Sequence, residues 1–393
     1  GELSVAKDGL DFETTESYTL KVLLSDAGSP VLSDTATVKI SILDVNEKPV
    51  VKDSSFSIAE NTLKGTSVGI LTFSDPDKLS PNNTLSFSIL SGNGDGFFSI
   101  SSTGELSVAK DGLDFETTES YTLKVLLSDA GSPVLSDTAT VQISVLDLNE
   151  KPTVKDDAFS IAENTLKGAS VGTLTFSDPD KLSPNNTLNF SILSGNGDGF
   201  FSISSTGELS VAKDGLDFET TASYTLTVLL TDAGSPSLKD TATVQITILD
   251  VNEKPIISDA SYLVEENNKS GLLLGTLSVS EPDILAPNNT LSFEILSGND
   301  GAYFAVSDDG KLTVARSGLD FESVESYTLT ILVSDAGTPV LSDTATVKIT
   351  VLDVNEKPTV KDDAFSIAEK TLKGTSVGTL TFSDPDKLSP NNT

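Results

Sequence analysis

The chain has 393 residues, with 58 Asp or Glu against 25 Lys or Arg and a net charge of −33 at pH 7. It contains no His, Cys, Met or Trp, which excludes a zinc site of the usual kind, a Ser-His-Asp triad and disulfides. An acidic surface repels phosphate backbones and anionic head groups, so we expect no nucleic acid as a partner and no direct membrane contact. The chain is nevertheless 37% hydrophobic, which is typical of a folded protein rather than a disordered polyanion.

The dominant feature of the sequence is an internal repeat with a period of 103 residues. The segment GELSV, or its variant GKLTV, begins at Gly1, Gly104, Gly207 and Gly310. This period is the size of a whole domain and is too long for a solenoid unit. We therefore expect a row of domains, seen as a window from a longer array. Its expected divisions are the C-terminal part of one repeat (1–49), three complete repeats (50–152, 153–255 and the more diverged 256–358) and the N-terminal part of a further repeat (359–393).

The sequence of each repeat predicts a succession of β-strands. Apolar residues alternate with polar ones between Tyr121 and Leu127, the pattern of a strand with one buried face. Turn-forming segments such as SGNGDG and DAGSP separate the runs. In chain order, the strands expected in the first complete repeat are 56–58, 68–73, 85–89, 97–100, 106–109, 121–127 and 138–146. About seven short strands in a domain of this size predict an all-β fold, namely tandem antiparallel Greek-key β-sandwiches in an elongated rod.

Five short acidic motifs recur once in every repeat, mostly where a strand meets a turn. In the first complete repeat they are AEN (Glu60), SDPD (Asp75, Asp77), LDFE (Asp114, Glu116), SDAG (Asp129) and DLNEKP (Asp147, Asn149, Glu150). Strand ends of a sandwich gather at two poles, so these carboxylates are expected to meet between consecutive repeats. Clustered carboxylates repel one another unless a cation lies between them, and Ca²⁺ suits such oxygen ligands better than Mg²⁺. The alternative is that these residues form turns and keep the chain soluble.

These motifs resemble those of cadherin repeats. AEN is similar to the cadherin xEN, LDFE to LDRE, SDPD to DxD, SDAGSP to DxGxP, and DLNEKP to the linker DxNDNxP. The resemblance covers every repeat. The Asn-Glu-Lys order of the linker looks closer to bacterial cadherin-like repeats, which suggests a bacterial cell-surface adhesin. The resemblance implies about three Ca²⁺ at each complete junction, where they turn a flexible string into a rod.

The resemblance also implies which residues hold the ions. Glu60, Asp114, Glu116 and Glu150 would surround two ions, together with the Leu148 carbonyl. The third ion would lie among Asn149, the Lys151 carbonyl, Asp178, Asp180 and Asp232, with a carbonyl near Asn185. Over the whole chain the implied metal ligands are Asp11, Glu13, Asn46, Glu47, Glu60, Asp75, Asp77, Asp114, Glu116, Asp129, Asn149, Glu150, Glu163, Asp178, Asp180, Asp217, Glu219, Asp232, Asn252, Glu253, Glu266, Glu281, Asp283, Asp320, Glu322, Asp335, Asn355, Glu356, Asp384 and Asp386.

The sequence departs from the family pattern at a few positions. Glu281 stands where other repeats have Asp, and its longer side chain is expected to weaken or rearrange that site. The linker lysines, such as Lys151, replace an asparagine that contributes through its carbonyl, and their ammonium groups are expected to lower ion affinity. The NNT segments match an N-glycosylation acceptor, which we interpret as a turn. They begin at Asn82, Asn185, Asn288 and Asn391.

The leading functional hypothesis is a calcium-rigidified extracellular spacer or adhesion module of a large surface protein. The alternative is a recognition module that binds carbohydrate or identical repeats, so the partners considered are neighbouring repeats, cell-surface glycans and identical repeats on another cell. Sugar-binding faces usually present exposed aromatic rings, whereas Phe56, Phe87 and Tyr121 occupy inward strand positions. An enzyme is not expected, because no acid-base pair stands out, and no catalytic or cofactor-binding residue is assigned.

Overall fold

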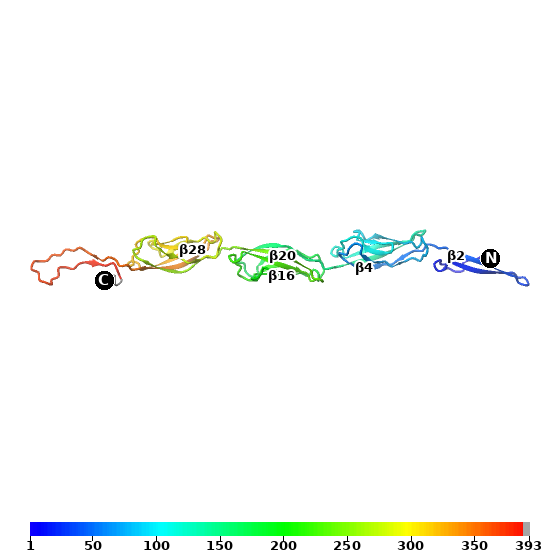
Figure 1. The fold of residues 1–393 in the computed structure, drawn as a ribbon, viewed down its shortest axis with the longest axis horizontal. Coiled ribbons are helices and arrows are strands. Elements are labelled where there is room, and N and C mark those ends of the chain that lie inside the picture. Colours follow the sequence, from blue (N-terminus) through cyan, green and yellow to red (C-terminus); the bar gives the residue numbers. More distant parts are fainter. Residues whose placement is uncertain (388–393) are drawn as a thin grey trace.

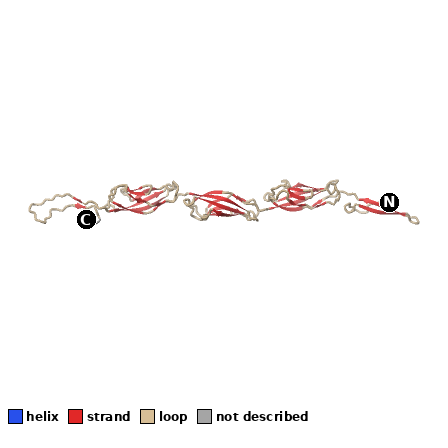
Figure 2. Ribbon diagram, viewed as in Figure 1, coloured by secondary structure: helices blue, strands red, loops and turns tan. Residues whose placement is uncertain are grey.

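The computed structural model describes residues 1–387, and within that range every regular element is a β-strand (Figure 2). The strands form three successive sandwiches arranged in a row, flanked by a shorter hairpin at one end and an extended segment at the other (Figure 1). The expected all-β fold of tandem sandwiches in an elongated rod is therefore confirmed. No helix among the described residues is long and apolar enough to cross a membrane.

The three complete sandwiches contain the same nine strand segments. The first has β3 (Val50–Val51), β4 (Ser54–Ala59), β5 (Ser67–Ile70), β6 (Phe73–Ser74), β7 (Ser86–Ser91), β8 (Phe98–Ile100), β9 (Glu105–Val108), β10 (Ser120–Ser128) and β11 (Ser136–Leu146). The second has β12 (Thr153–Val154), β13 (Asp157–Ala162), β14 (Ser170–Thr173), β15 (Phe176–Ser177), β16 (Asn189–Ser194), β17 (Phe201–Ile203), β18 (Glu208–Val211), β19 (Ser223–Thr231) and β20 (Lys239–Leu249). The third has β21 (Ile256–Ile257), β22 (Ala260–Glu265), β23 (Leu273–Thr276), β24 (Val279–Ser280), β25 (Ser292–Ser297), β26 (Phe304–Val306), β27 (Lys311–Val314), β28 (Ser326–Ser334) and β29 (Ser342–Leu352).

The hairpin β10–β11 supplies much of the core of the first sandwich. Alternate residues of β10 are buried while those between them are exposed or half-buried, as the sequence pattern predicts. Leu123 lies opposite Val141 and Val125 opposite Ala139, and all four are almost completely buried. Because each strand presents one apolar face, the two sheets close over a single hydrophobic core.

One strand pairing departs from a wholly antiparallel arrangement. The larger sheet has the order β4-β11-β10-β7, and β4 runs parallel to β11. The chain passes from one sheet to the other at Lys52 and Asp53: β3, before them, pairs with β6, and β4, after them, pairs with β11. Asp53 fixes this step, since its Oδ1 accepts a 2.7 Å hydrogen bond from the Thr140 main-chain N–H. The other sheet has the order β5-β9-β8. The parallel pairing brings the end of β4 beside the end of β11, which positions the acidic motifs that follow both strands.

The flanking segments repeat parts of the same architecture. Strands β1 (Ser17–Ser25) and β2 (Ser33–Ser41) form a hairpin equivalent to β10–β11, and β30 (Thr359–Val360) pairs with β31 (Phe382–Ser383). Leu20 and Val22 are exposed here, whereas their equivalents Leu123 and Val125 are buried. The difference follows from packing, because no second sheet covers β1.

Candidate metal centre

The acidic motifs of each repeat lie at its two poles. AEN follows β4, LDFE precedes β10 and the DxNEKP linker follows β11, so these three meet at the pole that faces the next repeat. SDPD follows the β6-type strand and SDAG follows the β10-type strand, at the opposite pole. Each complete junction therefore combines three motifs of one repeat with two motifs of the following repeat.

Glu60 holds the three motifs of the first repeat together. Its side chain is buried, with 1% exposure. Oε2 accepts a 2.9 Å hydrogen bond from the Phe115 N–H in LDFE, and Oε1 accepts a 2.7 Å bond from the Leu148 N–H in the linker. Charge-assisted bonds to main-chain N–H groups are strong and directional, so they fix the position of this carboxylate. The same pair of bonds recurs at Glu163 and Glu266.

Carboxylates from different motifs converge closely at the junctions. Around Glu116, ligand oxygens within 4.8 Å of one another form two groups, one with Glu60 and Asp114 and one with Asp147 and Asp180. Asp180 belongs to the following repeat, so the second group spans the junction. The next junction has the same two groups, which are Glu163, Asp217 and Glu219, and Glu219, Asp250 and Asp283.

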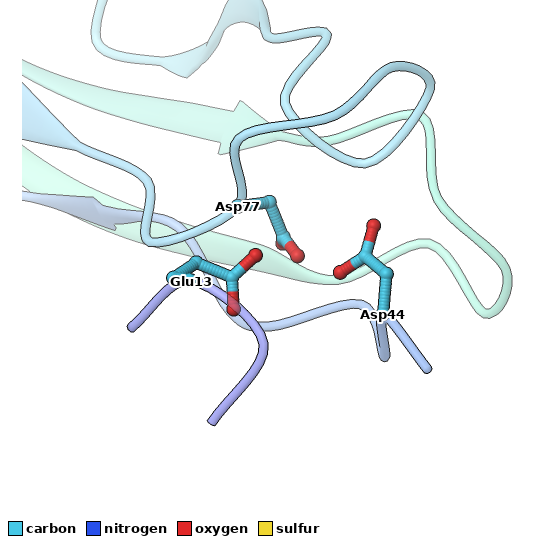
Figure 3. A group of neighbouring side chains, drawn as sticks. All are labelled: Glu13, Asp44 and Asp77. Atoms are coloured by element: carbon cyan, nitrogen blue, oxygen red, sulfur yellow. The ribbon is translucent and has the colours of Figure 1, made fainter. Parts of the chain in front are cut away.

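The first junction shows the spanning group clearly. Glu13 lies in a loop before β1, Asp44 in the linker and Asp77 in the SDPD loop of the following sandwich. Their carboxylates point toward a common space (Figure 3), with oxygens within 4.8 Å of one another. Three chain segments that are far apart in the sequence thus contribute one carboxylate each.

The linker asparagine of one repeat packs against the SDAG loop of the following repeat. Asn149 Nδ2 donates a 2.8 Å hydrogen bond to the Pro236 carbonyl, and a Cβ atom at Gly234 would lie 1.8 Å from Asn149 Oδ1. At the first junction, Asn46 Nδ2 also donates to Asp129 Oδ2, at 3.1 Å. The glycine after the SDAG aspartate is therefore required by the close approach of the asparagine rather than by its backbone angle.

Several buried oxygens at these junctions accept no hydrogen bond from any described residue. At the second junction they are Glu116 Oε2, Asp147 Oδ1, Asn149 Oδ1, Asp178 Oδ2 and Asp180 Oδ1. The equivalent five at the first junction are Glu13 Oε1, Asp44 Oδ1, Asn46 Oδ1, Asp75 Oδ2 and Asp77 Oδ1. Buried polar atoms are ordinarily satisfied, and these are all electron-rich oxygens of one chemical kind. The set fits a hard cation with several oxygen ligands, as Ca²⁺ requires.

The local electrostatics agree with a site built for a cation. Burial raises the pKa of Asp180 to about 7, and the nearby Asp178 and Asp147 add to the rise. Burial likewise raises the pKa of Glu219 to about 7, with repulsion from Glu163 and Asp250. The pKa of Asp114 is lowered instead, because the Thr117 hydroxyl and N–H donate to its carboxylate.

The implied ligands at all four junctions lie at the poles, and each junction links its linker to the next SDPD loop. The linker glutamate N–H donates to the second SDPD aspartate in the pairs Glu47–Asp77, Glu150–Asp180, Glu253–Asp283 and Glu356–Asp386. Glu281, the variant residue, still accepts the Asp283 N–H at 3.2 Å, as Asp178 accepts the Asp180 N–H at 3.0 Å. The remaining implied ligands lie in the loops next to these bonds. Asp11 is close enough to Glu47 to repel its carboxylate. Along the chain, Asp320 and Glu322 precede β28, Asp335 follows β28, Asn355 lies in the linker and Asp384 follows β31.

The first aspartate of the linker motif was absent from the implied ligand set. Asp44, Asp147 and Asp250 belong to the spanning groups described above. The sequence feature that could have identified them as ligands is the aspartate at the start of every DxNEKP motif. The NNT asparagines also reach the linker, since Asn82 Nδ2 donates to Asp44 Oδ2 at 3.1 Å and Asn288 Nδ2 to Asp250 Oδ2 at 3.2 Å. The copy at Asn391 lies outside the described residues.

The linker lysine does not point into the carboxylate groups. Lys151 Nζ lies 2.7 Å from Oδ1 of Asp240 in the following repeat, and Asp240 Oδ2 accepts the Val154 N–H at 3.0 Å. The same ion pair joins Lys48 to Asp137 and Lys254 to Asp343. The ammonium charge is therefore balanced by a partner of its own, and this removes the reason for expecting it to weaken ion binding.

Comparison with known proteins identifies the repeats. The family model described as "Cadherin domain" matches residues 54–146, 157–249 and 260–352. Mouse protocadherin Fat 4 is 35% identical over 408 residues, which cover 98% of this chain and 8% of that protein. Human protocadherin Fat 1 is 35% identical over 361 residues, covering 89% of this chain and 8% of that protein. The chain thus spans a small fraction of the length of these relatives.

Solved structures give the same result. The protocadherin gamma-B4 extracellular domain matches with a TM-score of 0.72 and 27% identity, covering 97% of this chain and 63% of that one. Repeats 22–24 of mouse cadherin-23 match with a TM-score of 0.61 and 25% identity, covering 78% of this chain and 99% of that one. The first of these is an extracellular domain, in agreement with the expected extracellular location.

Two expectations from the sequence are not supported by these comparisons. The relatives named above are animal proteins, so the comparisons do not support the bacterial assignment drawn from the Asn-Glu-Lys linker. Glycan binding has no support either, and the aromatic rings of the repeats pack on one another, as Phe98 does on Tyr121 at 5.0 Å between ring centroids.

Proposed function

Because the chain belongs to the cadherin family, we propose that calcium ions bind between its repeats and hold them in line as an extracellular adhesion or spacer module. Domains of this family generally bind calcium at inter-repeat junctions. The observation that carries the proposal for this chain is the set of five buried, unpartnered oxygens at the second junction, contributed by Glu116, Asp147, Asn149, Asp178 and Asp180.

The proposed ligands follow from the geometry. Glu60, Asp114 and Glu116 surround one ion, and Glu116, Asp147 and Asp180 surround a second ion that spans the repeats. Asn149, Asp178 and Asp232 lie on the side of the following repeat, where a third ion would be held. About three ions per complete junction would offset most of the local negative charge. The proposed divisions remain 1–49, 50–152, 153–255, 256–358 and 359–393, since the junction bonds cross each of these boundaries.

A second candidate function is recognition between identical chains. One matching structure, of protocadherin gamma-B7, is described as a cis-dimer and matches this chain with a TM-score of 0.64 and 27% identity. Its existence favours homophilic contact over glycan binding as a role beyond spacing. An analytical ultracentrifugation run with calcium tests this candidate, because a purely monomeric chain at high concentration would contradict it.

Small-angle scattering with and without a chelator tests the calcium proposal. We expect the maximum dimension of the chain to decrease and its flexibility to increase when calcium is removed, because the carboxylates at each junction then repel one another. Glu219→Gln should reproduce part of this change in the presence of calcium. Glu208→Gln, which removes the same charge from an exposed strand position of the same repeat, is the control. A scattering profile and melting temperature unaffected by the chelator would contradict the proposal.

A further inference from the structure

A lysine that follows the SDPD motif reaches back across the junction. Lys181 Nζ donates to the main-chain carbonyl of Glu116 in the preceding repeat. The main-chain N–H of Lys181 also donates to Glu116 Oε1, with an N···O distance of 3.3 Å. Lys78 makes the same ammonium contact with the Glu13 carbonyl, and Lys387 makes it with the Glu322 carbonyl. This contact recurs at three junctions, so it is a regular feature of the array.

The junction between 153–255 and 256–358 has no equivalent ammonium. Ile284 occupies the position of Lys181, and its side chain is 58% exposed. The Ile284 main-chain N–H still donates to Glu219, so the backbone part of the contact is kept. The linker pair Lys254–Asp343 and the Glu253–Asp283 bond are kept as well. The two junctions also differ at Glu281 and at Ile256, which stands where the preceding junction has Thr153, but Ile284 is the change that removes an ammonium group from between the repeats.

We propose that the lysine after the SDPD motif is a metal-independent strut between consecutive repeats, and that the junction carrying Ile284 is consequently the hinge of this array when calcium is scarce. The strut joins the loop after the SDPD motif to the LDFE loop of the preceding repeat, so it connects the two repeats at a second place in addition to the linker. It therefore opposes bending, which the single linker strand between the repeats resists weakly. An ammonium placed beside the carboxylates also offsets part of their repulsion, which isoleucine cannot do.

This inference goes beyond calcium binding, because it concerns the state without the metal. The chain has no cysteine, so pairs of introduced cysteines can carry spin labels at chosen sites. Gln142, Gln245 and Lys348 are exposed and occupy equivalent positions on β11, β20 and β29. The pair 142/245 reports on the Lys181 junction, and the pair 245/348 reports on the Ile284 junction. The measurement is the width of the distance distribution by pulsed electron paramagnetic resonance, in the full chain with EDTA.

We expect the 245/348 distribution to be wider than the 142/245 distribution. Lys181→Ile should widen the 142/245 distribution, and Ile284→Lys should narrow the 245/348 distribution. Lys155→Ile, a change of the same kind at an exposed position of the same repeat, should leave the 142/245 distribution unchanged. Equal widths for Lys181→Ile and Lys155→Ile, or no narrowing by Ile284→Lys, would overturn the proposal. Ile284→Lys adds a contact, so it tests the strut even if Lys181→Ile unfolds a repeat.

The same samples separate this proposal from the calcium proposal. Addition of Ca²⁺ should narrow both distributions in the wild-type chain. Failure of Ca²⁺ to narrow either one would contradict metal binding, whereas the strut is judged from the EDTA data alone.

Discussion

The main-chain N–H of Glu150 donates a 2.9 Å hydrogen bond to Asp180 Oδ2, which ties the linker of one repeat to the first acidic loop of the next. The other oxygen of the same carboxylate, Oδ1, is buried and accepts no hydrogen bond from the described residues. One side chain thus has a structural oxygen and an oxygen facing the carboxylates of the preceding repeat. The two roles can be separated by mutation.

Asp180→Asn should weaken calcium binding at the second junction while preserving the bond to Glu150. The amide oxygen can still accept the N–H, but the carboxylate charge is lost. We expect the apparent affinity to fall by at least about tenfold, equivalent to about 1.4 kcal/mol. Isothermal titration of the chain with Ca²⁺ measures this change. Asp180→Ala should in addition lower the melting temperature with EDTA present, because it leaves the Glu150 N–H without its acceptor. Equal calcium affinities for wild type and Asp180→Asn would show that this carboxylate is not a ligand.

Calcium affinity should rise with pH between about pH 6 and about pH 8 and change little above that range. The pKa of Asp180 and that of Glu219 are each raised to about 7, mainly by burial, so both groups are largely protonated at about pH 6. An ion must displace these protons, which costs about tenfold in affinity per proton at a pH one unit below the pKa. Titrations in buffers of different ionisation enthalpy measure the protons released. Binding that releases no protons near pH 6 would contradict the prediction.

The same shifts set the pH dependence of folding without calcium. The folded chain binds these protons more tightly than the unfolded chain, whose carboxylates have pKa values near 3.8 for Asp. The two carboxylates therefore make the metal-free chain less stable as pH rises from about 4 to about 7, with no further contribution above that window. Melting temperatures in EDTA across this range should decrease with pH, and saturating Ca²⁺ should abolish the decrease. Carboxylates with lowered pKa values, such as Asp114 and Asp240, act in the opposite direction, so the test is the comparison of the wild-type chain with Glu219→Gln. An identical pH dependence of the two melting temperatures would contradict the prediction.

Much of this architecture could be predicted from the sequence because it depends on periodic patterns. Alternation from Tyr121 to Leu127 located β10, and the repeated motifs placed Glu60 and Glu116 at a junction. The two-residue strand β3 was missed, since two residues carry no periodicity. The partner of Lys151 was also out of reach, because Asp240 lies 89 positions away and is aligned with it only by the sandwich topology. Pattern locates elements and motifs, whereas pairing between distant side chains needs the fold.

Gly234→Ala should disrupt the second junction. A Cβ atom there would lie 1.8 Å from Asn149 Oδ1, so the linker asparagine must move away from the SDAG loop. We expect a destabilisation of about 1–3 kcal/mol, the usual cost of overpacking, together with weaker calcium binding. Gly197→Ala is the matched control in the same repeat, since a Cβ at Gly197 would meet no atom within 4 Å. Both variants are compared by hydrogen exchange of the linker and by calcium titration. Similar behaviour of the two variants would show that the asparagine does not need this space.

The diverged repeat should become more stable on Ala302→Gly. Ala302 has a φ of 54°, whereas the equivalent turn positions of the other repeats are Gly96 and Gly199, each with a φ of 71°. The hydrogen bond that closes the turn is kept, since the N–H of Ala302 donates to the Asn299 carbonyl as that of Gly199 donates to the Asn196 carbonyl, although Gly301 in the third repeat also has a positive φ of 88°. A left-handed conformation destabilises a residue with a Cβ by about 1–2 kcal/mol. Glycine avoids this strain but loses more conformational entropy on folding, which offsets part of the gain. We therefore expect a gain of up to about 1 kcal/mol.

The reciprocal change, Gly199→Ala, should destabilise the second repeat by a similar amount. A Cβ at Gly199 would meet no atom within 4 Å, so backbone conformation is the property that changes. Hydrogen-exchange mass spectrometry resolves the two repeats, because the peptides around β16–β17 and β25–β26 differ in sequence. Protection should increase around Ala302→Gly and decrease around Gly199→Ala. If Ala302→Gly reduces protection instead, the packing of the alanine methyl group stabilises the repeat by more than the left-handed backbone conformation destabilises it.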